Sequence, residues 1–211
     1  MNAESYVDLI QKLKQFFSTS PMPGSEVQET MAPSYKKHIP VKHPIVDAAV
    51  LLLLYPIDDQ PYFVLIKRTP DDLSPHGGQV SLPGGKFESS DITYLNTALR
   101  ETSEEIGIPV NTIYTVGSLS SLIIPVSGYR VYPFVGYLNN KPVWSPNSSE
   151  VSYIIEVSIK ELIQPENVHY ETIIFEGNEH SIPYFKLVGE KVWGATAMIL
   201  AEFKAIILQI R

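Results

Sequence analysis

The sequence predicts an α+β fold in which mixed strands enclose one central helix. Two observations predict it. Short apolar runs separated by turn residues recur along the chain, which is typical of β-strands. Apolar residues also recur at helical spacing near the N-terminus, in the middle and at the C-terminus. The 211 residues suit one domain with an added terminal segment.

Residues 1–45 are predicted to precede the domain proper, which we expect to span residues 46–211. Apolar side chains recur at helical spacing over residues 4–17, so an amphipathic helix is expected there. Such a helix usually packs on its own domain, but a homodimer interface or a membrane surface is an alternative role. Prolines recur through residues 18–45, so we expect this segment to be irregular and extended.

The domain is expected to begin with a β-hairpin, because apolar runs at 46–55 and 62–67 flank a turn rich in proline and aspartate. A loop rich in glycine and proline follows from 70 to 86. The pattern then becomes helical from Ile92 and stops at Gly107. Further elements are expected in this order: strands at 112–119, 130–138 and 151–157, a short helix at 158–163, strands at 171–176 and 181–187, and a final helix at 195–210.

Composition excludes several functional classes. A net charge of −7 argues against a nucleic-acid backbone binder, although a bound cation can still attract a phosphate-containing small molecule. The absence of cysteine excludes disulfides, thiolate metal sites and a cysteine nucleophile. The most apolar run, 48–55, is far shorter than the roughly 20 residues that cross a bilayer, and no signal-peptide pattern is visible. We therefore expect a cytoplasmic protein that binds neither membrane nor nucleic acid.

The central helix carries a cluster of carboxylates. Glu101, Glu104 and Glu105 stand at i, i+3 and i+4, so they share one helix face. Their mutual repulsion would be relieved by a hard divalent cation such as Mg²⁺ or Mn²⁺, which prefers oxygen ligands. A glutamate-rich face is usually just solvated. The turn Gly84-Gly85 shortly before the helix favours a site, because glycine backbone can approach a ligand closely.

The stretch from Gly85 to Ile108 resembles the Nudix box, in which a glycine and an acidic residue precede Arg-Glu, a Glu-Glu pair and a final glycine. The resemblance implies the Nudix fold, a mixed β-sheet sandwiched between α-helices (α/β/α), here with an extra N-terminal helix. It also implies metal-dependent hydrolysis of a pyrophosphate bond. Two departures stand out: Asp91 replaces the usual glutamate with one extra residue before the helix, and Thr102 replaces an aliphatic residue.

The resemblance also assigns roles to residues of the helix and its preceding turn. Glu101, Glu104 and Glu105 would be metal ligands, and a carbonyl of the Gly84-Gly85 turn would add another. Arg100 lies four residues before Glu104 and would orient a glutamate without touching the metal. The general base would be either a helix glutamate or one from a later loop.

Two further residue assignments concern that base and the contact with substrate. Glu150, in the segment Asn147-Ser148-Ser149-Glu150, is the candidate for a base from a later loop, with an ordinary exposed loop charge as the alternative. Gly85 is expected to contact the substrate.

Similarity extends to the coenzyme A pyrophosphatase branch of this family. It is carried by the segments 65–69, 76–85, 127–136 and 192–197. The branch implies cleavage of coenzyme A or acyl-coenzyme A to 3′,5′-ADP and (acyl-)4′-phosphopantetheine.

Two basic residues of these segments are candidates for binding the substrate. Arg68 is expected near a substrate phosphate, although a basic residue at a strand end is more often merely on the surface. His76 is expected to bind phosphate, to act as an acid, or to satisfy a loop hydrogen bond. The sequence alone does not choose among these roles.

One substitution keeps a second substrate class open. The branch has an arginine where this chain has Ser74, and a guanidinium is the natural clamp for a phosphate. Its loss favours the alternative of a Nudix hydrolase for ADP-ribose or a dinucleotide. A third alternative, a non-catalytic nucleotide-binding regulator, is disfavoured because all three helix glutamates are present. The family resemblance also leaves a homodimer open.

Overall fold

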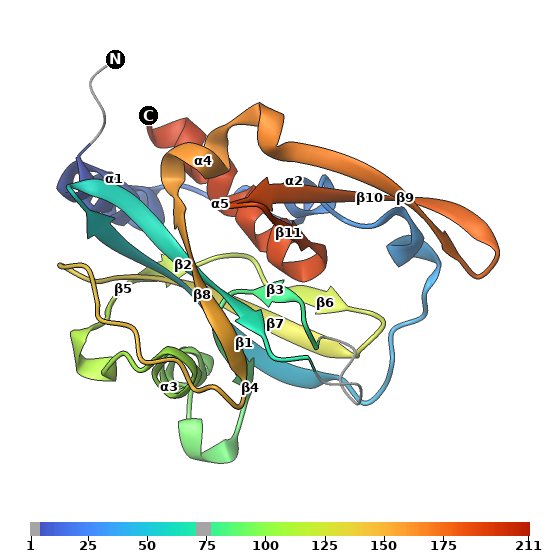
Figure 1. Ribbon diagram of the computed structural model, residues 1–211, viewed down its shortest axis with the longest axis horizontal. Helices are drawn as coiled ribbons and strands as arrows, with labels where there is room; N and C mark the ends of the chain where they lie inside the picture. The colour runs from blue at the N-terminus through green and yellow to red at the C-terminus, as the bar shows by residue number, and fades with distance from the viewer. Residues whose placement is uncertain (1–4, 71–76) are drawn as a thin grey trace.

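The computed structural model describes residues 5–70 and 77–211 (Figure 1). Within these residues the chain forms five α-helices and eleven strands. The helices are α1 (Tyr6–Thr19), α2 (Ser25–Glu29), α3 (Tyr94–Ile106), α4 (Ile159–Ile163) and α5 (Gly194–Ile210). The strands are β1 (Val46–Ile57), β2 (Gln60–Arg68), β3 (Val80–Ser81), β4 (Gly84–Lys86), β5 (Tyr114–Ser118), β6 (Leu122–Ile124), β7 (Tyr129–Tyr137), β8 (Val151–Ser158), β9 (Val168–Phe175), β10 (Asn178–Leu187) and β11 (Glu190–Trp193).

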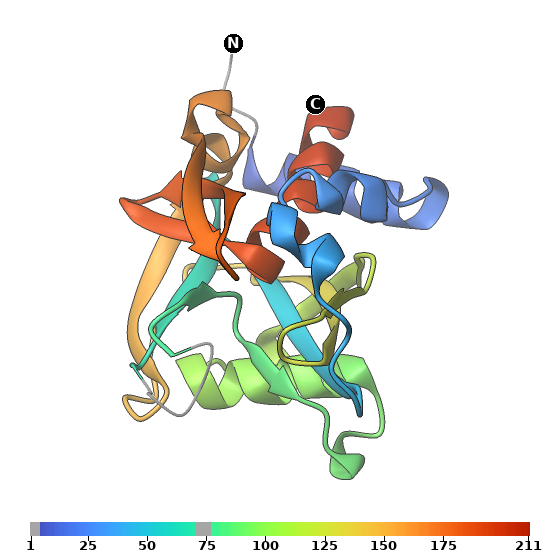
Figure 2. The same ribbon diagram turned by 90° about the vertical axis from the view of Figure 1, so that its right-hand side faces the viewer.

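The larger sheet is mixed and lies between helices on both faces. Its backbone order is β3-β2-β1-β7-β5, with β4 paired to β1, β6 to β7 and β8 to β2. Strands β1 and β7 run parallel, and the other pairs are antiparallel. Figure 2 shows α3 on one side of this sheet and α1, α2 and α5 on the other. The expected α+β sandwich with an added N-terminal helix is therefore confirmed.

The continuous apolar run of β1 follows from this sandwich, because a strand covered on both faces must be apolar on both. Leu51 and Leu53 pack in one core cluster with Ala98 of α3. Leu52 and Leu54 pack in a second cluster with residues of α1 and α5. The four leucines of β1 are fully buried.

Helix α1 packs on its own domain, which was the commoner of the alternatives expected for it. Leu9 and Leu13 are fully buried, and the Tyr6 hydroxyl lies 2.7 Å from the Leu138 carbonyl oxygen and 3.1 Å from that of Leu54. In the described part of the chain, no helix is both long and apolar enough to cross a membrane.

The prediction of an extended segment over 18–45 is wrong in two places. Helix α2 forms at Ser25–Glu29, and a short 3-10 helix forms at Ser34–His38. Tertiary contacts explain both. The side chain of Glu202 in α5 accepts hydrogen bonds from the backbone amide of Gly24 at 3.0 Å and from the side-chain amide of Gln28 at 2.8 Å. Local proline content could not reveal these distant partners.

A second, three-stranded antiparallel sheet, β9-β10-β11, lies on the side of α5 (Figure 1). Its hairpin strands are longer than predicted, because the turn between them is confined to Glu176 and Gly177, both at positive φ. The 3-10 helix contacts this hairpin. Tyr35 stacks on Phe175 with ring centroids 4.8 Å apart, and the Ser181 amide donates to the Ser34 hydroxyl at 3.1 Å.

Candidate active site

Helix α3 is held in place from both ends and from one face. The Thr93 hydroxyl accepts a hydrogen bond from the Asn96 amide at 3.2 Å and so caps the first turn. Gly107 ends the helix in the left-handed conformation, with φ 75°. Ala98 and Ile106 are fully buried against the sheet. This packing directs the end of α3 toward strand β4.

Glu105 is the most buried carboxylate of the helix, with 1% of the residue exposed. It accepts a hydrogen bond from the Gly84 amide at 2.8 Å and one from the Arg68 guanidinium at 3.3 Å. Burial raises the pKa of Glu105 to about 7, although the Gly84 amide and Arg68 oppose this. The fold thus holds a carboxylate where its charge is only partly compensated.

Glu101 lies one helical turn away and packs against the backbone of Gly85. A Cβ at position 85 would stand 2.5 Å from the Glu101 carboxylate, so a larger residue there would displace that carboxylate. Burial raises the pKa of Glu101, while the neighbouring Arg100 lowers it. Gly84 is more tightly constrained, because its φ is 146° and a side chain would overlap the backbone of β1. The two glycines let the carboxylates approach the main chain.

Arg100 connects the carboxylates around the site. Its Nε and Nη2 atoms bind Asp91 at 2.7 and 3.0 Å, and Nη1 lies 2.9 Å from both Glu101 and Glu104. Asp91 is itself fixed, because it also accepts from the Glu88 amide and the Thr97 hydroxyl. Its hydrogen bond with Arg100 holds the pKa of Asp91 well below the usual range. Asp91 therefore anchors the guanidinium, a contact that the sequence left open.

Glu104 lies apart from the other two glutamates. Its side chain is 55% exposed and is bound by Arg100, whereas Glu101 and Glu105 line a cavity. Among the described residues, no three histidine, aspartate or glutamate side chains are placed so that they could hold a metal ion. The helix face expected from the spacing is thus divided by packing into an inward pair and an outward residue.

The inward pair lines one cavity with several other residues predicted from the sequence. The cavity volume is about 490 Å³, and its lining includes Arg68, Gly84, Gly85 and Glu150. Glu150 also accepts a hydrogen bond from the Asn147 side chain at 3.2 Å.

Other residues of the same segments differ in where they lie. Lys67, which precedes Arg68, pairs with Glu190 at 2.9 Å. Ser74 and His76 fall outside the described residues. Tyr129 lines the cavity, whereas Tyr132 stacks on Tyr94 at 3.9 Å, centroid to centroid, on the α3 side of the sheet.

The aliphatic lining of the cavity has no local signature in the sequence. Much of it comes from β6 with its following turn, from α5, and from residues 33–39. Of these segments, α5 was expected as a helix and residues 33–39 as irregular chain, whereas nothing was predicted for residues 122–126. Only the way the fold brings them together makes them one surface.

Comparison with known proteins adds a family match and fold neighbours. The family model described as "NUDIX domain" matches residues 46–176. "Uncharacterized Nudix hydrolase NudL" of Yersinia pestis (strain Pestoides F) is 35% identical over 137 residues, which are 65% of this chain and 68% of that protein.

Two solved structures show the same fold at low sequence identity. RenU, a Nudix hydrolase from M. smegmatis, has a TM-score of 0.56 at 16% identity, over 82% of this chain and 95% of its own. A MutT/nudix family protein from Enterococcus faecalis has a TM-score of 0.50 at 16% identity, over 95% of this chain and 78% of its own.

Proposed function

The chain belongs to the Nudix family, and we propose that it hydrolyses the pyrophosphate bond of a nucleoside-diphosphate-linked small molecule with the help of a divalent cation. The observation that carries this proposal is the pair Glu101 and Glu105 beside the Gly84-Gly85 backbone at the cavity. A buried carboxylate with a raised pKa and an incomplete set of partners is typical of a functional group.

The residues present fit a divalent cation by their chemistry. The carboxylates and main-chain carbonyls here are oxygen donors, which Mg²⁺ and Mn²⁺ prefer. A cation would also offset the charge that burial disfavours at Glu105. We propose Glu101 and Glu105 as ligands with the Gly84 carbonyl, and Glu104 as a third ligand once it leaves Arg100. Arg100 and Asp91 would fix the orientation of the helix carboxylates.

The remaining residues would act on the substrate and on water. A bound cation would neutralise the diphosphate, polarise phosphorus and lower the pKa of a bound water. We propose that the Arg68 guanidinium, which lies 3.3 Å from Glu105, binds a phosphate oxygen. Glu150 is our candidate to accept the proton of the attacking water, because it lines the same cavity as Glu101 and Glu105. Attack on one phosphorus expels the other phosphate as the leaving group.

We propose coenzyme A or acyl-coenzyme A as the substrate, with 3′,5′-ADP and (acyl-)4′-phosphopantetheine as products. Support comes from the resemblance of segments 65–69, 76–85 and 127–136 to that branch, and from a cavity whose lining is largely aliphatic. The cavity is more suitable for an aliphatic group than for a second ribose, since ribose hydroxyls would lose hydrogen bonds to water there.

The test is a product assay with Mg²⁺ or Mn²⁺. The protein is offered coenzyme A, acetyl-coenzyme A, ADP-ribose and NADH, and the products are separated by chromatography. We expect 3′,5′-ADP from the two coenzyme A substrates. Preference for ADP-ribose or the dinucleotide would contradict the proposed substrate. Nucleotide binding without turnover of any compound would instead indicate a non-catalytic regulator.

A further inference from the structure

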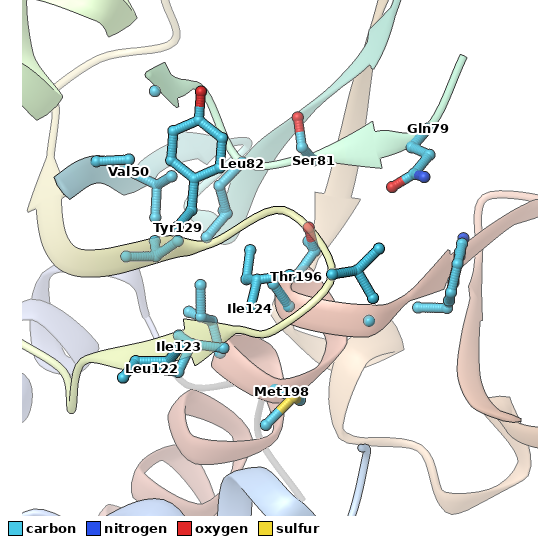
Figure 3. A pocket seen from close by; sticks show the side chains of 18 of the residues that line it. Val50, Gln79, Ser81, Leu82, Leu122, Ile123, Ile124, Tyr129, Thr196 and Met198 are labelled. Carbon is cyan, nitrogen blue, oxygen red and sulfur yellow. The ribbon is translucent and has the colours of Figure 1, made fainter. Parts of the chain in front are cut away.

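The cavity beyond the carboxylates is bounded by aliphatic side chains. Figure 3 shows Ile124 of β6 and Met198 of α5 on one side and Leu82 on the other. These walls begin directly at the carboxylate end, because Val50 of β1 is the pairing partner of Gly84. A group held here would therefore be joined to the diphosphate through a short link. The volume, about 490 Å³, lies within the range of roughly 300–1,000 Å³ typical of small-molecule sites.

The polar groups within this aliphatic part are few and neutral. Among them are the Gln79 amide, directed toward the cavity in Figure 3, and the hydroxyls of Ser81, Tyr129 and Thr196. The Ser81 oxygen is buried without a partner in the described part of the chain, and Thr196 makes only a long bond of 3.4 Å to the Val80 carbonyl. Neutral donors and acceptors of this kind suit amide groups on a mainly hydrocarbon chain.

The charged lining residues are arranged differently. Arg68, Glu101, Glu105 and Glu150 belong to the carboxylate end described above, and Lys86 adjoins it as the residue after Gly85. Lys36 lies on the opposite wall, where its ammonium group pairs with Glu29 at 2.7 Å. The cavity thus has a charged end suited to the diphosphate and a largely aliphatic remainder, in which Lys36 is paired with Glu29.

Two walls of the cavity come from outside the matched region 46–176. Tyr35 and Ile39 contribute from the N-terminal side and Thr196 and Met198 from α5. The N-terminal wall is fixed by the stacking of Tyr35 on the β9–β10 hairpin and by the bonds of Gly24 and Gln28 to Glu202. These walls therefore belong to this chain's own terminal segments.

We infer that this cavity binds the aliphatic, amide-bearing arm of the substrate, and that the nucleoside half lies outside it. The inference rests on the proposed function, because coenzyme A supplies such an arm. Its pantetheine half carries two methyl groups close to the diphosphate and two amides further along. Methyl groups match Val50, Leu82 and Ile124, and the amides match the neutral groups of Gln79, Ser81 and Thr196. Ribose in the same place would set hydroxyl groups against hydrocarbon.

The two products of coenzyme A cleavage separate the two halves of the ligand and provide the test. Binding of 4′-phosphopantetheine and of 3′,5′-ADP is measured by calorimetry at one fixed Mg²⁺ concentration. In Ile124→Asn we expect 4′-phosphopantetheine to bind roughly tenfold more weakly and 3′,5′-ADP to bind within about twofold of the wild type. The matched control is Ile174→Asn, since Ile174 is 67% exposed on β9 and lies outside the cavity lining.

A second variant keeps the test valid if Ile124→Asn does not fold. Val126 lines the cavity but is 50% exposed, so Val126→Asn is expected to fold and to show a smaller shift of the same sign. The inference is overturned if the variants weaken 3′,5′-ADP selectively, weaken both products equally, or weaken neither. Failure of the proposed function looks different. The wild type would then bind 4′-phosphopantetheine in a wall-dependent manner without cleaving coenzyme A.

Discussion

Two helices of this protein each bury a glutamate, and the two carboxylates have opposite surroundings. Glu202 of α5 is fully buried and accepts four hydrogen bonds, from the Gly24 and Ser120 amides, the Gln28 side chain and the Ser120 hydroxyl, at 2.7–3.0 Å. Glu105 of α3 is 1% exposed and accepts two, one of them at 3.3 Å. Burial alone therefore does not indicate function. The number of donors distinguishes a carboxylate that holds the fold together from one that can still bind a ligand.

The largest effect is expected for Glu105→Gln, which tests whether the carboxylate with few hydrogen-bond donors is the functional one. It keeps the shape and an oxygen for the Gly84 amide but removes the charge that would bind a cation. We expect kcat to fall by more than about a hundredfold, while the free energy of unfolding, compared below about pH 4.5 where Glu105 is protonated, changes by less than about 1 kcal/mol. Steady-state kinetics at saturating Mg²⁺ and urea unfolding measure the two effects. Near-normal kcat would remove Glu105 from the site.

The next largest effect is expected in how the free energy of unfolding depends on pH, because Glu105 is buried with few donors. The pKa of Glu105 is raised from 4.5 to about 7, so the folded state holds a proton that the unfolded state has lost. The resulting stabilisation is complete below about pH 4.5 and is lost as the pH rises through 7. We expect the wild type to lose up to about 3 kcal/mol relative to Glu105→Gln over this window.

The measurement is metal-free urea unfolding of both proteins at a series of pH values. Mg²⁺ should reduce the difference between the two proteins, because a bound cation favours the charged carboxylate. Parallel stability curves for the two proteins would contradict the raised pKa.

The same substitution at the second carboxylate, Glu202→Gln, should have the reverse effect. A carboxamide sets an NH₂ group against donors of Gly24, Gln28 and Ser120, so buried hydrogen bonds are lost. We expect a loss of about 2 kcal/mol in the free energy of unfolding, with kcat kept at temperatures where the protein is folded. Chemical unfolding and kinetics on the same preparation test this. An unchanged free energy of unfolding would show that the hydrogen bonds of Glu202 do not stabilise the fold.

The smallest expected effect concerns the residue that orients the carboxylates. Arg100→Lys keeps the charge but cannot contact Asp91, Glu101 and Glu104 together. We expect the Mg²⁺ concentration for half-maximal activity to rise roughly tenfold. Arg130→Lys is the control, since Arg130 carries the same charge and lies outside the cavity lining. An equal effect in the control would remove the positioning role from Arg100.

The elements that could be predicted from the sequence are those marked by a local pattern of apolar residues. The apolar run at 46–55 identifies β1, because a strand buried on both faces is continuously apolar. The helical spacing of apolar residues in 94–106 identifies α3, because a helix buried on one face is apolar only along that face. Strands β3 and β4 span only two and three residues and depend on pairing with β2 and β1, so no local pattern marks them.

The candidate site divides in the same way. Helical spacing puts Glu104 and Glu105 on one face, but only the packing of α3 against Gly84 separates the inward residue from the outward one. The partners of Glu202 are 82 to 178 residues away in sequence, beyond the reach of any motif. The metal-ligand and base assignments stay predictions.

The four bonds of Glu202 also order events during synthesis of the chain. They join the loop before α2, residue Ser120 and helix α5, so they cannot form until Glu202 has left the ribosome. Strands β1 to β8 can pair earlier, because their partners are already present. The bonds of Gly24 and Gln28 that help to fix the N-terminal wall of the cavity therefore form late. A nascent chain arrested before Ala201 would carry the carboxylate helix but lack these bonds.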